Sequence, residues 1–184
     1  MDRSTILAGF GGQGLLFAGK VLAEAALLDG LETLWIPSYG PEMRGGTASC
    51  TVIISDGQIG SPIVDRADHA LVLNPPSLAR YAPIVAPGGL LVVNDSLVEA
   101  EVARDDIEAV RVPCTALAAR AGDDRLVSVV ALGALLARRR DLVTRASVER
   151  AIEVILGPRR PELIEADGAA LAAGYDAALE RVIA

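Results

Sequence analysis

The sequence predicts an α/β fold: a three-layer, Rossmann-like sandwich with a largely parallel sheet and a helical C-terminal portion. Two observations predict it. Short apolar runs alternate with helix-like segments through the first two thirds of the chain, and from Thr115 onward the pattern is helical. A length of 184 residues allows a sizeable core. Because no repeat, low-complexity segment or linker divides the chain, we expect a single domain over residues 1–184.

Six apolar runs have the length and the residue types of buried strands. They are residues 4–10, 31–37, 47–55, 68–74, 88–94 and 110–113. The third run follows a glycine-rich loop rather than a helix. The predicted sheet therefore has room for an antiparallel strand among its parallel ones.

Helices are predicted where apolar residues recur at a spacing of three or four. They are residues 15–30, 75–83, 114–122, 126–139, 144–155 and 160–182. Prolines open the second helix, and Thr144 is expected to cap the fifth. The fourth is so apolar that we expect it to be buried on most sides.

Charge and composition argue against several classes of function. The formal net charge is −7, whereas a nucleic-acid partner normally requires a basic face. No run of 18 apolar residues predicts a membrane span, and no signal peptide precedes the first strand, so we expect a cytoplasmic protein. The two cysteines, Cys50 and Cys114, are too few for a four-thiolate metal site and are expected to be small buried hydrophobes.

A glycine-rich turn, GFGGQG at residues 9–14, follows the first predicted strand and opens the first helix. Glycines permit close backbone approach, and a helix N-terminus attracts an anion. A dinucleotide site also needs an acid at the end of the second strand, but Glu32 lies at its beginning. We therefore disfavour NAD or FAD. The turn either meets an anionic group of another ligand, contacts another subunit, or only lets the strand and helix pack closely.

A second unusual loop, SYGPEMRGG at residues 38–46, follows the second predicted strand. Both loops therefore follow carboxyl ends of strands, which meet at the ligand-binding edge of an open α/β sheet. Arg44 is able to clamp a phosphate or carboxylate, and Tyr39 to stack or donate a hydrogen bond. Gly45 and Gly46 allow a ligand or a partner's backbone to come close.

These motifs, in this order, resemble the gamma subunits of the 2-oxoacid:ferredoxin oxidoreductases, which include the pyruvate, 2-oxoisovalerate and 2-oxoglutarate enzymes. The resemblance rests on GFGGQG, PSYGPEMRGGTASCTVIIS, IGSP, VLNPPSL, PGGLLVVNDSLV and VPCTALAARAGDDRLVSVVALGALL. It runs from Thr5 to about Leu136. The sequence departs from the family where Ser128-Val129 stands in place of an Asn-Met-like pair, so no role of that Asn is carried over.

The resemblance implies a complex that oxidatively decarboxylates a 2-oxoacid with coenzyme A, giving an acyl-CoA, CO2 and reduced ferredoxin. It implies alpha and beta subunits that form the thiamine diphosphate and Mg²⁺ site, with iron–sulfur clusters in the beta subunit, a delta subunit or fused equivalents. Ferredoxin is implied as a partner of the assembled complex. The chain alone is expected to bind none of these cofactors and to show no activity, and neither nucleic acid nor membrane is an expected partner.

We expect the two glycine loops either to line the coenzyme A site or to dock onto the alpha and beta subunits. The residues assigned to cofactor binding are Gly11, Gly12, Gln13, Gly14, Tyr39, Met43, Arg44 and Gly45, with no catalytic or metal-binding residue. Two alternatives stay open: a subunit of an indolepyruvate-type oxidoreductase, and a stand-alone Rossmann-like nucleotide-binding domain. The sequence does not indicate which 2-oxoacid is used, because the substrate pocket is expected in other chains.

Four further features are expected to be structural. Asn74 and Asn94, each at the end of a predicted strand, are expected to cap the next turn. His69, the only histidine, is expected in or near the core. Residues 138–140, three consecutive arginines, are expected to form a solvated helix end, where cations favour the helix dipole.

Overall fold

A computed structural model of the chain describes residues 2–39 and 46–180 and, at Tyr39, only the backbone. Its strands are β1 (Arg3–Phe10), β2 (Glu32–Tyr39), β3 (Thr47–Ser55), β4 (Ala67–Val72), β5 (Val85–Asn94) and β6 (Glu108–Val112). Its helices are α1 (Leu15–Leu28), α2 (Pro75–Tyr81), α3 (Cys114–Arg120), α4 (Val127–Arg138), α5 (Arg145–Leu156) and α6 (Pro161–Glu180). Two short 3₁₀ turns, Ala82–Ile84 and Asp124–Leu126, precede β5 and α4.

The six strands form one mixed sheet in the order β2-β3-β1-β4-β5-β6. β1, β4, β5 and β6 pair in parallel, as crossovers through helices and long connections require. β3 runs antiparallel between β1 and β2. The predicted α/β fold is thus confirmed, and β3 is the antiparallel strand for which the sequence left room.

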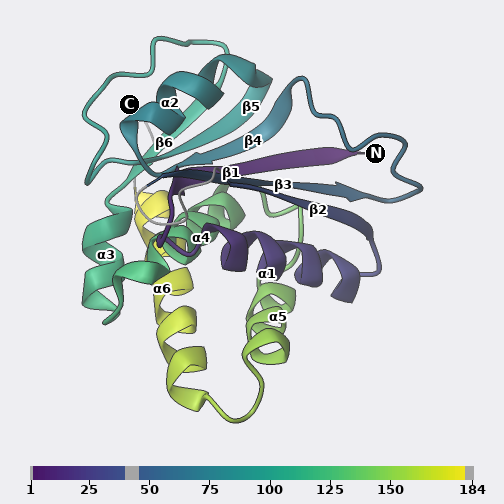
Figure 1. Ribbon diagram of the computed structural model, residues 1–184, viewed down its shortest axis with the longest axis vertical. Helices are drawn as coiled ribbons and strands as arrows, with labels where there is room; N and C mark the ends of the chain where they lie inside the picture. The colour runs from purple at the N-terminus through teal and green to yellow at the C-terminus, as the bar shows by residue number, and fades with distance from the viewer. Residues whose placement is uncertain (1, 40–45, 181–184) are drawn as a thin grey trace.

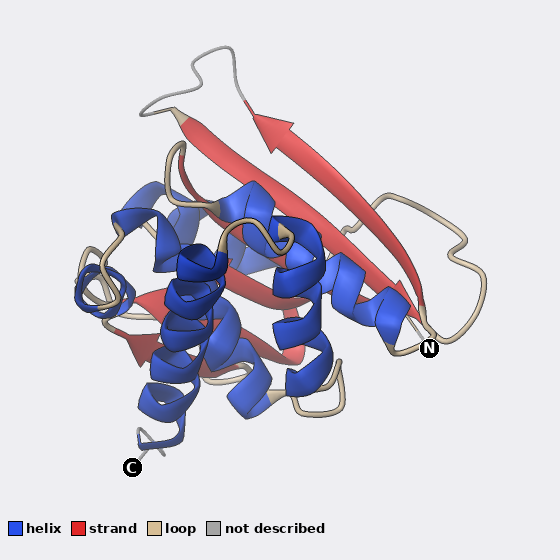
Figure 2. Cartoon of the chain, turned by 90° about the horizontal axis from the view of Figure 1, so that it is seen from below, coloured by secondary structure: helices blue, strands red, loops and turns tan. Residues whose placement is uncertain are grey.

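Helices cover the two faces of the sheet unequally (Figure 1). α2 lies on one face, over a small core that includes Val72, Leu91 and Val93. α1 and α4 lie on the other face, over the main core, and α5 and α6 pack outside them. Figure 2 shows β2 and β3 as one margin of the sheet, extending past the helical layer. No described helix is long and apolar enough to cross a membrane.

The helical portion is held by close backbone packing. α4 and α6 make their tightest approach at glycines, because a Cβ at Gly133 would lie 2.1 Å from the Leu171 carbonyl oxygen and one at Gly174 1.9 Å from that of Val130. As predicted, α4 is buried on almost every side. Thr144 caps α5, as predicted, by accepting a 3.1 Å hydrogen bond from the Ser147 N–H.

The observed elements agree with the sequence prediction to within a few residues at their ends. The largest difference for the site is at β4, which ends at Val72, so that Asn74 belongs to the start of α2 rather than to the strand. The predicted last helix extends into residues 181–184, which lie outside the described part of the chain.

Candidate functional site at the carboxyl edge of the sheet

The carboxyl ends of β1, β2 and β4 gather at one edge of the sheet, which we call the carboxyl edge. Phe10 at the end of β1 pairs with Thr47, and Tyr39 at the end of β2 pairs with Ala48. The Leu73 N–H, just beyond β4, donates to the Ala8 carbonyl at 2.9 Å. The GFGGQG turn and both ends of the SYGPEMRGG loop therefore lie at this edge, as the sequence predicted.

A backbone hydrogen bond ties the roots of the two glycine loops together. The Gly11 N–H donates to the Gly46 carbonyl oxygen at 2.9 Å. The turn is also closed on itself, because the Gln13 N–H donates to the Phe10 carbonyl at 3.3 Å and the Gln13 Oε1 accepts from the Phe10 N–H at 2.7 Å. The backbone N–H and the side-chain oxygen of Gln13 are thus both hydrogen-bonded within the turn.

The glycines of the turn do not all serve the same purpose. Gly14 has φ +75°, and a Cβ there would lie 2.3 Å from the Arg125 carbonyl oxygen and 2.9 Å from the Ser128 hydroxyl. A Cβ at Gly9 would lie 2.3 Å from the Gln13 Oε1. Gly12, with φ +102°, has nothing within 4 Å of such a Cβ. Gly9 and Gly14 permit packing, whereas Gly12 faces open space.

Several of the assigned site residues lie outside the described residues. Met43, Arg44 and Gly45 fall in the segment 40–45, and only the backbone of Tyr39 is described. The structure brings together the assigned residues 11–14 and the two ends of the second loop.

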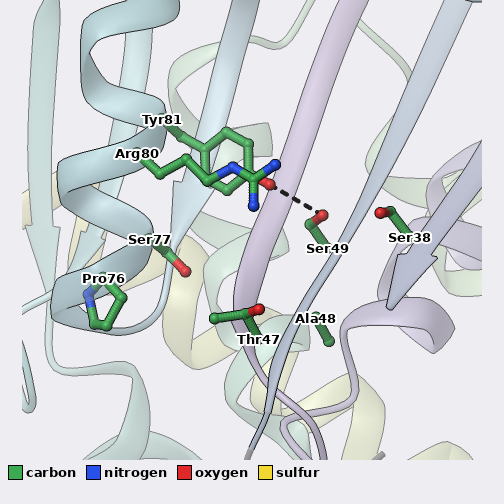
Figure 3. A pocket seen from close by; sticks show the side chains of 8 residues that line it. All are labelled: Ser38, Thr47, Ala48, Ser49, Pro76, Ser77, Arg80 and Tyr81. Atoms are coloured by element: carbon green, nitrogen blue, oxygen red, sulfur yellow. Dashed lines mark hydrogen bonds between the residues drawn. The ribbon is translucent and has the colours of Figure 1, made fainter. Parts of the chain in front are cut away.

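A polar hollow of about 220 Å³ opens beside the second loop, between α2, the end of β2 and the start of β3. We call it the α2 hollow; it is lined by Ser38, Thr47, Ala48, Ser49, Pro76, Ser77, Arg80 and Tyr81 (Figure 3). The Tyr81 hydroxyl donates to the Ser49 hydroxyl at 3.1 Å. The Arg80 guanidinium lies 5.2 Å from the centre of the Tyr81 ring.

Sequence reasoning missed the α2 hollow. Arg80 and Tyr81 sit on a short helix with no motif of its own, and Ser49 lies within an ordinary-looking strand. The only indication in the sequence was the group of hydroxyl residues around the second loop, Ser38, Thr47 and Ser49, which only the fold places opposite α2.

Asn74 and Asn94 hold the carboxyl edge in place. The Asn74 Oδ1 accepts from the Ser77 N–H at 2.9 Å and so caps α2. The Asn94 Nδ2 donates to the Leu73 carbonyl and to the Thr115 hydroxyl, while its Oδ1 accepts from the Thr115 N–H. Both side chains are fully buried. The prediction that each caps the following turn is confirmed for Asn74. It is wrong for Asn94, whose side chain instead joins the end of β4 to the start of α3.

A second, more apolar hollow of about 270 Å³ lies on the other side of the GFGGQG turn, between the starts of α1 and α4 and the first half of α6. Gly14 and Phe17 line it together with Asp167 of α6. Burial, and then the nearby charge of Asp123, raises the pKa of the Asp167 carboxyl to about 6. The Asp123 charge is itself paired with Arg125 at 2.5 Å.

His69 and the arginine run have structural roles. His69 is buried on β4, its Nδ1 lies 3.1 Å from the Thr5 hydroxyl, and burial lowers its pKa to about 4. The expectation of a solvated arginine end is wrong for Arg138 and Arg139. Their side chains are only 19% and 21% exposed, and both bind Glu108 of β6, at 2.5 and 2.6 Å.

Comparison with known proteins assigns the fold to a family. The family described as pyruvate ferredoxin/flavodoxin oxidoreductase matches residues 4–177. The chain belongs to this family. Subunit KorC of the 2-oxoglutarate synthase of Methanocaldococcus jannaschii is 32% identical over an alignment of 184 positions, which covers 98% of this chain and 96% of that subunit.

A solved relative has the same fold over almost its whole length. The gamma subunit of a keto/oxoacid ferredoxin oxidoreductase from Geobacter sulfurreducens PCA is 30% identical, with a TM-score of 0.81 over 97% of this chain and 99% of that one. The resemblance to the gamma subunits is confirmed.

Another relative is longer than this chain. The ketoisovalerate oxidoreductase subunit VorA of Methanothermobacter thermautotrophicus is 38% identical over 176 residues, which are 96% of this chain but 36% of that subunit. The chain thus spans about a third of that relative's length.

Proposed function

We propose that this chain serves a 2-oxoacid:ferredoxin oxidoreductase complex that converts a 2-oxoacid and coenzyme A into an acyl-CoA, CO2 and reduced ferredoxin. The similarity to a separate gamma subunit over nearly the full length of both chains carries this proposal. The matches to 2-oxoglutarate and ketoisovalerate enzymes do not favour the indolepyruvate alternative. The absence of an acid at the end of β2 argues against a stand-alone dinucleotide-binding domain.

We propose that the alpha and beta subunits, with or without a delta subunit, hold the thiamine diphosphate, Mg²⁺ and iron–sulfur clusters. Two cysteines do not suffice for a four-thiolate cluster, and both are buried. The Cys50 thiol donates to the Leu15 carbonyl, and burial raises its pKa to about 12, so it is a poor thiolate ligand. Among the described residues no group of three His, Cys, Asp or Glu side chains is arranged to hold a metal ion.

We propose that the carboxyl edge forms one wall of the coenzyme A site. The hydrogen bond between Gly11 and Gly46 supports this proposal, because it gives the two glycine loops a common base. Residues 11–14 then lie beside the ligand, with Tyr39, Met43, Arg44 and Gly45 contributed by the second loop. The rival proposal is that the same loops only dock onto the sister subunits.

Substitution of Arg44 separates these two roles. In the assembled complex, Arg44→Ala is expected to raise KM for coenzyme A while the subunits still copurify, because a charge-assisted contact to the ligand is lost. Loss of assembly with unchanged affinity for coenzyme A would show docking instead. Coexpression with the sister subunits is the control, since a chain that stays alone and binds NAD tightly would refute the assignment to the complex.

A further inference from the structure

The α2 hollow has the charge of an anion site. Among the described residues that line it, Arg80 is the only ionisable group besides Tyr81, and none is a carboxylate. No ion pair joins Arg80 to an acid within the part of the chain that the structure describes; its guanidinium packs over the Tyr81 ring. In a chain of net charge −7, a hollow that contains an arginine and no acid is electrostatically distinct from the rest of the molecule.

Hydroxyl groups line the same hollow as this arginine. Ser38, Thr47, Ser49 and Ser77 line the hollow from three elements, and Figure 3 shows the Arg80 guanidinium extending over the Tyr81 ring toward β3. Since the Ser49 hydroxyl oxygen accepts a hydrogen bond from the Tyr81 hydroxyl, the Ser49 hydroxyl hydrogen is free to point at a ligand. A guanidinium and several hydroxyl donors suit an anion with three or more acceptor oxygens better than a carboxylate with two.

The GFGGQG turn is less suited to this task than its sequence indicates. Its Gly11 and Gln13 N–H groups already donate to backbone carbonyls, and the Gln13 side chain is bound to the Phe10 N–H. The unpaired cation at the carboxyl edge, among the described residues, is instead Arg80 of α2.

We infer that the α2 hollow binds a phosphate monoester, with Arg80 as the charged contact and the Ser49 and Ser77 hydroxyls as donors. Its volume of about 220 Å³ accommodates a phosphate group and a few waters but not a whole nucleotide. This inference deepens the proposed function, on which its choice of ligand rests: in the complex the group bound is the 3′-phosphate of coenzyme A.

The phosphate site itself is testable on the full chain without its partners. Titration with inorganic phosphate, followed by NMR, is expected to shift the amide signals of Ser49, Ser77 and Tyr81. Arg80→Ala is expected to weaken this binding about tenfold, since hydrogen bonds to charged groups are worth about 1.5–3 kcal/mol. Arg150→Ala, on the exposed face of α5, is the matched control and should bind like the wild type. Equal binding by Arg80→Ala, or equal shifts with acetate, would overturn the inference.

The source of the phosphate is tested in the assembled complex. KM for coenzyme A and for 3′-dephospho-coenzyme A is measured with wild type and Arg80→Ala. The wild type is expected to prefer coenzyme A by about tenfold, and the variant to lose most of that preference. An unchanged preference in the variant would refute coenzyme A as the ligand of the hollow, whereas the result with inorganic phosphate alone decides whether the hollow is a phosphate site.

Discussion

Alanine substitutions at Gly14 and Gly12 test whether the first glycine motif is built for packing. Both residues have positive φ, +75° and +102°, so alanine is strained at either position. The strain costs about 1–2 kcal/mol. Only at Gly14 would the new methyl also meet neighbours, 2.3 Å from the Arg125 carbonyl oxygen and 2.9 Å from the Ser128 hydroxyl. Because the Arg125 neighbour is backbone, relief requires the 3₁₀ turn before α4 to move away from the glycine turn.

The clash adds about 1–3 kcal/mol, the usual cost of overpacking a tight contact. We therefore expect Gly14→Ala to lose about 2–5 kcal/mol of unfolding free energy, and Gly12→Ala about 1–2 kcal/mol. For a chain of this length each kcal/mol corresponds to about 2–4 °C in Tm. Thermal and urea unfolding of the two variants measure the difference, with Gly12→Ala as the control for backbone strain. Equal losses in the two variants would refute the packing role of Gly14.

Three further predictions concern buried polar groups. His69, the only histidine, is expected to stay neutral down to about pH 5, because burial lowers its pKa to about 4. The stability that the neutral imidazole contributes to the folded state is lost as the pH falls from 6.5 toward 4. An NMR titration of the imidazole with a midpoint near 6.5 would contradict this prediction. Asp167→Asn is expected to be as stable as the wild type near pH 4 and more stable by about 1–2 kcal/mol at pH 7. The reason is that the pKa of Asp167 is raised from 3.8 to about 6, so the wild type loses unfolding free energy as the pH rises from about 4 to about 6. Urea unfolding at both pH values measures the difference, and a difference that does not depend on pH would refute the prediction. Asn94→Ala removes three hydrogen bonds from a buried site and is expected to cost about 2–3 kcal/mol in chemical denaturation, whereas a loss below about 0.5 kcal/mol would refute its bridging role.

The features predictable from sequence were local ones. The Thr144 cap, the Asn74 cap and the strand that follows the second loop all depend on neighbouring residues, so their patterns are visible in the chain itself. The antiparallel direction of β3 was left open, because the loop before it permits either a hairpin or a crossover.

The features that escaped prediction join distant parts of the chain. The burial of Arg138 and Arg139 depends on Glu108, about 30 residues earlier, which the sheet brings to the end of α4. The α2 hollow likewise exists only because α2 lies opposite the start of β3 and the end of β2. The position of both glycine loops after strand ends located the carboxyl edge, but neither it nor the resemblance to a family offered a reason to consider Arg80.

Amide hydrogen exchange on the assembled complex tests most directly whether the carboxyl edge carries the functional contact. The account predicts slower exchange at residues 10–14 and 46–49 when the chain joins its sister subunits, and a further decrease at residues 46–49 and 77–81 when coenzyme A is added. Protection confined to α5 and α6, with the carboxyl edge exchanging as in the free chain, would contradict it.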